Sequence, residues 1–168
     1  MKIWLIGDRE ANRIQIGENL AQKLGWPFID ANRLLEQENN SSVSNLVARW
    51  GWAEFCLRLN KRVRSLARSR QDEVISVGQS VGFDHNNLAL FKKKGYVVFI
   101  ATAAQAILEK VMSTGRDGSL PSSLAQVLET KIDLPKRYLD LEIESTGAGP
   151  IEDAERIISS LFKDNDQV

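Results

Sequence analysis

The sequence has little of several residue types, and each shortage bears on what the protein can be. A single cysteine, Cys56, rules out an internal disulfide and suits a reducing compartment, so we expect a cytoplasmic protein. No apolar run approaches the roughly 20 residues that span a bilayer, and the short apolar stretch after Met1 does not resemble a signal peptide. We therefore expect no membrane role.

The chain also lacks an excess of charge of either sign. The 22 Lys and Arg residues balance the 22 Asp and Glu residues. No global field attracts the protein to polyanions, so we expect no nucleic-acid partner. Its 168 residues suit one domain, which we predict to span residues 1–163, followed by a disordered polar tail at 164–168.

Short, unbroken apolar runs alternate along the chain with segments of helical period. Such runs are typical of strands buried on both faces of a parallel sheet. Four strands are predicted in this way: Lys2 to Ile6, Pro27 to Asp30, Val74 to Val77, and Tyr96 to Ala101. A fifth, Leu141 to Glu144, alternates apolar and acidic residues, which predicts a half-exposed strand at the sheet's edge.

The intervening segments have helical patterns with matching end signals. Gly25 lies where the first helix needs a C-cap, and Pro150 opens the last helix, which runs to Phe162. Two helices broken near Gly51 are predicted between Ser42 and Arg68, a further helix over Ile107 to Met112, and a surface loop over Ser113 to Ser123. The order of elements predicts an α/β protein whose ligands bind at the carboxyl ends of parallel strands.

The first strand-to-helix turn is where such a fold binds phosphate. The segment from Gly7 to Gly17, followed by Leu20 to Asp30, resembles the opening of shikimate kinase, a P-loop kinase of the nucleoside-monophosphate-kinase type. The resemblance continues in order and in register through three further segments, which contain Gly51 to Phe55, Val74 to Ser80 and Thr146 to Pro150.

The resemblance implies a specific fold and a specific activity. The fold is a three-layer α/β/α P-loop kinase fold, with a five-stranded parallel sheet of order 2-3-1-4-5 and, in this chain, a shortened lid. The activity is transfer of a phosphoryl group from ATP to the 3-hydroxyl of shikimate, with Mg²⁺ as cofactor.

The nucleotide-binding positions that the resemblance identifies are largely replaced. A P-loop has the form GxxxxGK[ST], because glycines let backbone amides surround the phosphates, Lys neutralises them and the hydroxyl ligates Mg²⁺. Gly7 remains, whereas Asn12, Arg13 and Ile14 stand at the second glycine, the lysine and the hydroxyl residue. The planar guanidinium does not reproduce a compact ammonium, and Ile14 cannot ligate a cation.

The shikimate-binding positions are altered as well. Asp30 remains of two aspartates, but Asn32 replaces the second and cannot accept a hydroxyl proton as a carboxylate can. Cys56 stands where the family has an arginine that clamps the shikimate carboxylate. One glycine of a glycine-rich turn remains and two are replaced, over Gly78, Gln79 and Ser80.

Together these replacements predict a protein that does not transfer phosphate. We expect no catalytic residue, only vestigial Asp30 and Arg13, no metal site and no cofactor. The protein would then be a non-catalytic binding or regulatory protein with a protein partner. The alternative is an active or weakly active kinase of shikimate or a related small molecule, using ATP and Mg²⁺, in which Arg13 contacts phosphate and Asp30 lies near the metal. A dinucleotide-binding domain is a third hypothesis, but the first turn lacks GxGxxG, the glycine motif of such domains.

Other conspicuous residues have simpler predicted roles. His85, the only histidine, is predicted to be a surface or capping residue, and Cys56 a semi-buried filler rather than a nucleophile. Trp50 and Trp52 are predicted to pack in the core or to fill the former acceptor pocket, and the alternative for them is a partner-binding surface. A basic run is assigned to a solvated helix face: Lys61, Arg62, Arg64, Arg68 and Arg70.

Overall fold

A parallel five-stranded sheet forms the centre of the protein. A computed structural model describes residues 1–7, 12–102, 134–145 and 149–162. The strands are β1 (Lys2–Gly7), β2 (Phe28–Asp30), β3 (Glu73–Val77), β4 (Tyr96–Thr102) and β5 (Leu141–Ser145). Their order is β2-β3-β1-β4-β5, and every pairing is parallel. All five predicted strands and their predicted order are confirmed, and β5 is the predicted half-exposed edge strand.

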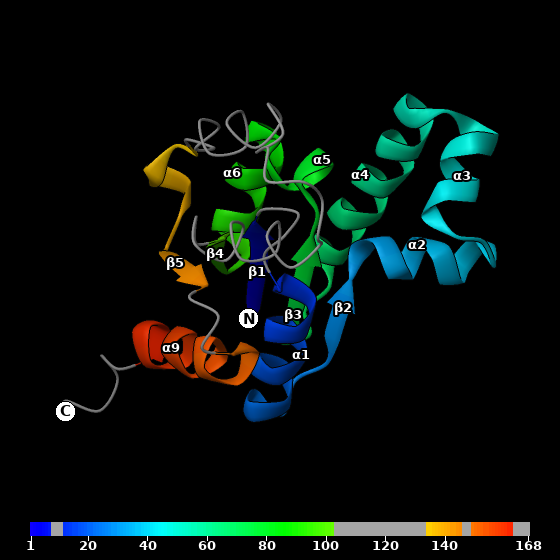
Figure 1. Ribbon diagram of the computed structural model, residues 1–168. Coiled ribbons are helices and arrows are strands. Elements are labelled where there is room, and N and C mark those ends of the chain that lie inside the picture. Colours follow the sequence, from blue (N-terminus) through cyan, green and yellow to red (C-terminus); the bar gives the residue numbers. More distant parts are fainter. Residues whose placement is uncertain (8–11, 103–133, 146–148, 163–168) are drawn as a thin grey trace, which may run out of the picture.

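Helices cover both faces of this sheet (Figure 1). On one face lie α1 (Arg13–Leu24) and α9 (Pro150–Phe162). On the other lie α2 (Ala31–Asn39), α3 (Val43–Trp50), α4 (Trp52–Arg68), α5 (Gln79–Gly82) and α6 (His85–Lys94), with a short 3-10 turn, η1, at Lys136–Tyr138. The three-layer α/β/α architecture predicted from the family resemblance is therefore confirmed.

Alternation along the central strand β1 divides the core into two layers. Trp4 and Ile6 point into the layer beneath α4 and α6, whereas Ile3 and Leu5 point into the layer beneath α1 and α9. Every residue of β1 is buried, which explains why the strand reads as an unbroken apolar run. Trp4 stacks on Phe91 of α6, with their ring centroids 4.1 Å apart.

Helix ends follow the predicted signals, although the pattern did not predict every helix. Gly25 caps α1 in the left-handed conformation, and Gly51, at φ 80°, separates α3 from α4. The pattern did not predict α5, α6 or α2, and α2 has only two buried residues. Asp30 begins it by accepting the backbone N–H groups of Asn32 at 3.1 Å and Arg33 at 3.0 Å.

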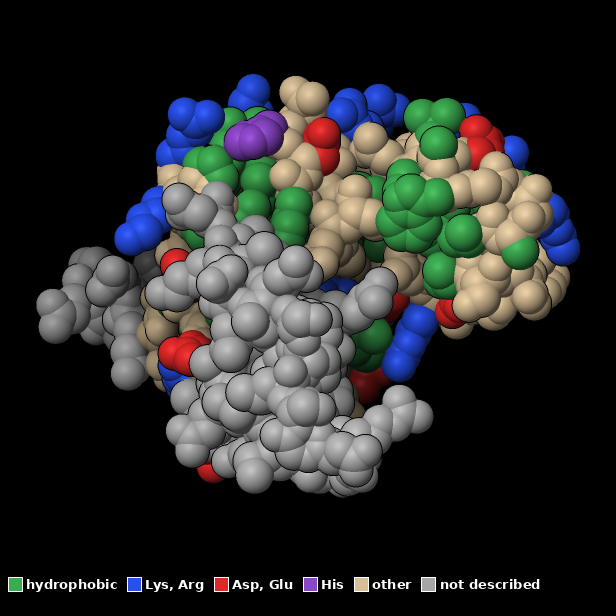
Figure 2. All heavy atoms as spheres, turned by 45° about the horizontal axis from the view of Figure 1, so that its top comes forward, with side chains coloured by type: hydrophobic (Ala, Val, Ile, Leu, Met, Phe, Trp, Pro, Cys, Tyr) green, Lys and Arg blue, Asp and Glu red, His purple; other side chains and the backbone are tan. Residues whose placement is uncertain are grey.

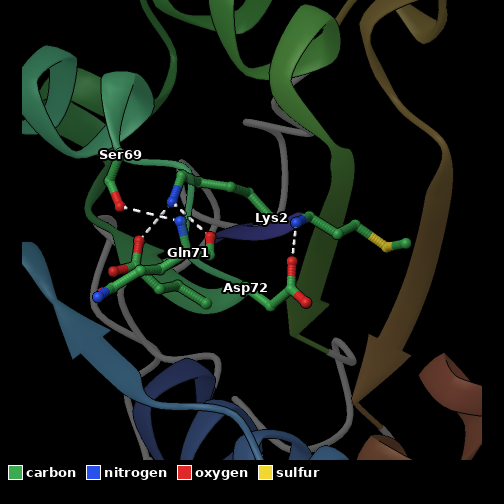
Figure 3. A network of polar contacts seen from close by, with 6 residues as sticks. Lys2, Ser69, Gln71 and Asp72 are labelled. Atoms are coloured by element: carbon green, nitrogen blue, oxygen red, sulfur yellow. Dashed lines mark hydrogen bonds and ion pairs between the residues drawn. The ribbon is translucent and has the colours of Figure 1, made fainter.

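The amino ends of β1 and β3 are joined by a polar network at the opposite end of the sheet from the first strand-to-helix turn (Figure 3). The Lys2 ammonium is buried and pairs with the Glu73 carboxylate, and it also donates to the Gln71 carbonyl at 3.0 Å. The N-terminal ammonium pairs with Asp72. These contacts connect residues about seventy positions apart and hold the two strands in register.

Several sequence predictions lie outside the described residues. They are the helix over Ile107 to Met112, the loop over Ser113 to Ser123, the shortened lid and the tail at 164–168. The single domain over residues 1–163 stays a prediction. Within the described segments, no helix is long and apolar enough to cross a membrane.

Candidate functional site

Arg13 is the central residue of the site at the carboxyl ends of β1 and β3. It is the first residue of α1, and its Nε donates to the Ser76 hydroxyl at 2.8 Å. One terminal nitrogen also donates to the Gly7 carbonyl at 3.3 Å. Ser76 lies on β3 and is fully buried. The guanidinium therefore connects the ends of two neighbouring strands through protein acceptors.

Burial and a nearby carboxylate act on the Arg13 guanidinium in opposite directions. Burial lowers its pKa from the ordinary value, and the negative charge of Asp30 partly offsets this effect. Asp30 is itself buried at the end of β2 and accepts the first backbone N–H groups of α2. Because an arginine starts from so high a pKa, the side chain stays cationic at neutral pH. The negative charge of Asp30 thus offsets part of the positive charge of Arg13.

Asn32 extends this cluster toward the turn after β3. A Cβ atom placed on Gly78 would lie 3.7 Å from the Asn32 amide nitrogen and 3.9 Å from a terminal nitrogen of Arg13. The Asn32 amide oxygen is buried and has no hydrogen-bond partner among the described residues. It is a free acceptor for a ligand hydroxyl or a water molecule.

Cys56 lies on α4, and its neighbour Ser80 belongs to α5. Burial raises the pKa of the Cys56 thiol, and this effect outweighs the opposite effect of the nearby Ser80 side chain. The thiol is therefore neutral at physiological pH and a poor nucleophile. Cys56 is half-buried and packs against the core, so its predicted semi-buried position is confirmed.

Gly7, the one retained glycine of the P-loop pattern, has a packing role that requires no phosphate. A Cβ atom here would lie 2.3 Å from the carbonyl oxygen of Ile100 on β4. That distance is far inside van der Waals contact, and backbone atoms cannot turn away as a side chain can. Retention of Gly7 is therefore explained by the close approach of two strands.

The remaining predicted site residues contribute less to this cluster. Asn12 precedes α1, is exposed and makes no side-chain capping bond, although its carbonyl accepts the Ile16 N–H at 2.9 Å. Ile14 and Gln79 are half-buried. The structure therefore brings together Arg13, Asp30, Asn32 and Gly78, and separately Cys56 and Ser80.

Ser76 is a site residue that the sequence analysis did not identify. Its signal was a hydroxyl within the apolar run Val74 to Val77, where a fully buried polar group needs a partner. The partner is Arg13, 63 positions earlier in the chain. Only the pairing of β1 with β3 brings these two residues together.

The two tryptophans beside the site, Trp50 and Trp52, differ in how far they are exposed. Trp50 is half-buried and carries the Arg58 guanidinium 4.4 Å above its ring. Trp52 is 56% exposed and stacks on Phe55, with ring centroids 5.7 Å apart. The prediction that both tryptophans fill the core or the old pocket is wrong for Trp52, because the first turn of α4 directs this side chain into solvent. His85 is exposed, as predicted.

A groove of about 230 Å³ lies beside this cluster rather than in it. It runs along the edge strand β2 and helix α2, and its lining comprises Phe28, Ile29, Asp30, Arg33, Leu34 and Gln37. Asp30 is the residue it shares with the Arg13 cluster. Within the described part of the chain, no three His, Cys, Asp or Glu side chains converge as metal ligands would.

Comparison with known proteins identifies the family of this chain. Residues 13–162 match the model of the shikimate kinase family. The chain belongs to the shikimate kinase family. It is 29% identical to shikimate kinase 2 of Yersinia enterocolitica over 133 residues, covering 79% of this chain and 75% of the relative. It is 24% identical to the shikimate kinase of Persephonella marina, with coverage of 95% and 98%.

Solved structures of this family share the fold over almost the full length. The shikimate kinase of Aquifex aeolicus superimposes with a TM-score of 0.80 at 23% identity, over 98% of both chains. The Acinetobacter baumannii enzyme, solved in complex with shikimate, gives 0.81 at 22% identity, over 99% of this chain and 95% of that one. At such identities these structures show the fold alone, so the activity must be argued from the residues of the site.

Proposed function

We propose that this member of the shikimate kinase family does not transfer phosphate from ATP to shikimate and acts instead as a non-catalytic binding or regulatory protein. The observation that supports it best is the arrangement of Arg13. At the position where the family resemblance places a phosphate-binding lysine, the cation is bonded to Ser76 and to the Gly7 carbonyl.

The nucleotide side of the site favours this proposal on physical grounds. Phosphoryl transfer depends on positioning and on neutralising the charge of the transferred group, with Mg²⁺ held close by. Arg13 already directs its Nε to Ser76 and one terminal nitrogen to the Gly7 carbonyl, and the nearby charge of Asp30 offsets part of its own, so less of its charge is available to a phosphate. Ile14, at the position of the Mg²⁺-binding hydroxyl, offers no oxygen at all.

The acceptor side supports the same conclusion. Cys56 is a neutral thiol where the resemblance implies a carboxylate-binding arginine, because burial raises the pKa of this thiol. Asn32 offers an amide where the resemblance implies a proton-accepting carboxylate. The chain has therefore replaced a charged clamp and a general base by neutral groups.

A weakly active kinase is the second candidate, and Asp30 is the observation that favours it. Its carboxylate remains buried at the end of β2 and interacts electrostatically with Arg13. In such a kinase, Asp30 would lie near Mg²⁺ and Arg13 would contact phosphate. Turnover of Mg²⁺-ATP that disappears in Asp30→Ala would establish this function.

Calorimetric titration separates the two candidates. We expect purified protein to give no saturable heat with Mg²⁺-ATP or with shikimate up to millimolar concentrations, and no thermal stabilisation by either ligand. Saturable binding of both ligands, together with formation of ADP, would contradict the proposal. An active family member titrated in the same buffer is the positive control.

The proposal extends to cofactor, partner and compartment. We propose that the protein works without nucleotide or metal and that its partner is another protein. The cytoplasm is the proposed compartment, supported by the single free cysteine.

A further inference from the structure

Strand β2 is one edge of the sheet, and in the described part of the chain it pairs only with β3 (Figure 1). The Val74 N–H donates to the Pro27 carbonyl at 3.0 Å, which fixes the register of this pair. The backbone groups of successive strand residues point to opposite sides, so Ile29 turns its N–H and C=O toward β3. Phe28 therefore turns its N–H and C=O outward, and Asp30 turns its N–H outward. Among the described residues, none bonds to these three groups.

The two edges of the sheet differ in how their side chains treat an incoming strand. On the edge strand β5, Glu142 and Glu144 are exposed, and charged side chains discourage the pairing of a strand edge with another chain. In β2, Phe28 and Ile29 are apolar and half-buried. Phe28 packs against α1, where a Cβ atom on Gly17 would lie 2.3 Å from its ring, and Ile29 packs on the other face of the sheet. The edge of β2 thus carries no comparable charge within the strand that would keep another chain away.

The groove of about 230 Å³ lies along this open edge. Its apolar part comes from Phe28, Ile29 and Leu34, and its polar part includes the exposed Gln37 side chain, whose amide has no hydrogen-bond partner among the described residues. An α-helix with its side chains is about 10–12 Å across, so even one turn of it would exceed this volume. The groove has room for a single side chain beside an extended backbone.

We propose that the open edge of β2 binds an extended segment of a partner protein, which adds to the sheet as a further strand. The segment's backbone would bond to Phe28 and Asp30, and one of its apolar side chains would enter the groove beside Leu34. A neighbouring polar side chain would meet the Gln37 amide. The inference rests on the proposed function and deepens it, because it names the chemistry of the protein partner.

Two other surfaces or occupants agree less well with these observations. Hydrophobic side chains also gather at the end of the molecule that carries α3 and α4 (Figure 2). The backbone there is helical and largely bonded within the helices, so it offers no comparable edge to a partner. A second copy could pair through its own β2, but its Phe28 and Ile29 side chains are packed within their own chain and cannot fill the groove. An extended segment of a partner satisfies both the backbone and the groove.

Fluorescence anisotropy with synthetic peptides tests this proposal. The probes are four dye-labelled heptapeptides in which threonine alternates with valine, leucine, isoleucine or phenylalanine, all residues that favour extended backbone or fill an apolar groove. We expect at least one of them to bind with a Kd below about 1 mM. In that peptide, N-methylation of one set of alternate amides should weaken binding at least about tenfold, and N-methylation of the other set less than about threefold, because only one set faces the edge.

A matched pair of protein variants tests the groove itself. Gln37→Trp places an indole in the groove and should weaken peptide binding at least about tenfold. Asn86→Trp makes a similar change, from an amide to an indole, at an exposed position on α6 outside the groove, and should change the affinity by less than about twofold. Both side chains are exposed, so circular dichroism should show an unchanged fold.

Four outcomes would overturn strand addition at β2. They are no binding of any of the four peptides up to about 1 mM, equal weakening by the two methylation patterns, equal effects of the two tryptophan variants, and sedimentation as a dimer that Gln37→Trp abolishes, which would assign the edge to a second copy. Titrating the same samples with Mg²⁺-ATP keeps the two proposals separate. Peptide binding with ATP turnover would refute only the loss of catalysis, whereas absence of both would refute only strand addition.

Discussion

The Nε atom of Arg13 donates a hydrogen bond to the hydroxyl of Ser76 at 2.8 Å, and this bond ties the beginning of α1 to β3. The same guanidinium donates to the Gly7 carbonyl at the end of β1. Arg13 therefore connects the beginning of α1 with the ends of β1 and β3. The contribution of these bonds to the fold can be measured as stability.

Removing the Ser76 hydroxyl should reduce the free energy of unfolding. Ser76→Ala leaves a partly buried guanidinium without one acceptor, which costs about 1–2 kcal/mol for a bond to a charged group. Urea denaturation would measure the loss. Ser65→Ala, at an exposed position on α4, is the matched control and should change stability by less than about 0.5 kcal/mol. Equal small effects would show that the bond contributes nothing.

Two glycines of the site should respond oppositely to the same substitution. Gly7→Ala forces a methyl group to within 2.3 Å of the Ile100 carbonyl oxygen, and we expect destabilisation of about 1–3 kcal/mol or more. Gly78→Ala meets nothing closer than 3.7 Å and has an ordinary backbone conformation, so it should be tolerated. Thermal denaturation of both variants tests this contrast, which fails if Gly7→Ala is as stable as Gly78→Ala.

Cys56 should react slowly with iodoacetamide in the folded protein. Burial raises the pKa of its thiol, so at any pH near neutrality the folded chain has less thiolate than the unfolded chain. Mass spectrometry of samples alkylated with and without urea would show slower labelling of the folded protein, with the rate rising as the pH increases. Faster labelling of the folded protein would mean that the thiol is activated.

The buried pair of Lys2 and Glu73 should be sensitive to the loss of one partner. Glu73→Leu leaves the Lys2 ammonium buried with only the Gln71 carbonyl, and we expect a loss of about 3–5 kcal/mol. The double variant Lys2→Met/Glu73→Leu removes both charges and should recover most of that stability. A double variant no better than the single one would contradict this account.

Restoring the family residues tests whether the scaffold still supports the old chemistry. The variant combines Asn12→Gly, Arg13→Lys, Ile14→Thr, Asn32→Asp and Cys56→Arg. Because the family fold is retained, we expect it to bind Mg²⁺-ATP where the natural sequence gives no saturable heat. Calorimetry measures the gain, and a folded variant that binds no nucleotide would show that changes elsewhere also contribute to the loss.

The fold was predictable from the sequence to a large extent. Unbroken apolar runs identified the strands because the sheet is covered on both faces, and Gly25, Gly51 and Pro150 marked helix ends through local backbone geometry. The helix α2 was missed because it buries only Ala31 and Leu35, too few to produce a clear periodic pattern. The N-cap Asp30 was its only strong signal.

The site was predictable in composition but not in geometry. The family resemblance predicts that Arg13, Asn32 and Cys56 are replaced positions, but it does not give their present surroundings. Arg13 bonds a serine from a distant strand, and Cys56 on α4 lies near Ser80 on α5. The exposure of Trp52 was likewise misjudged, because the direction of the first residue of a helix depends on how that helix packs.

The present contacts of the site residues affect which substitutions could restore the family residues. Arg13 bonds Ser76 and the Gly7 carbonyl, and Cys56 lies near Ser80, so reversion of either residue alone changes its present contacts before a second residue is present to use the new group. A lone Cys56→Arg, for example, would bring a guanidinium beside Ser80. The free energy of unfolding would fall with the first reversion. On the proposed function, phosphoryl transfer would return only with the last reversion. On the proposed function, the present contacts of Arg13 and Cys56 would make the loss of phosphoryl transfer hard to reverse by single substitutions.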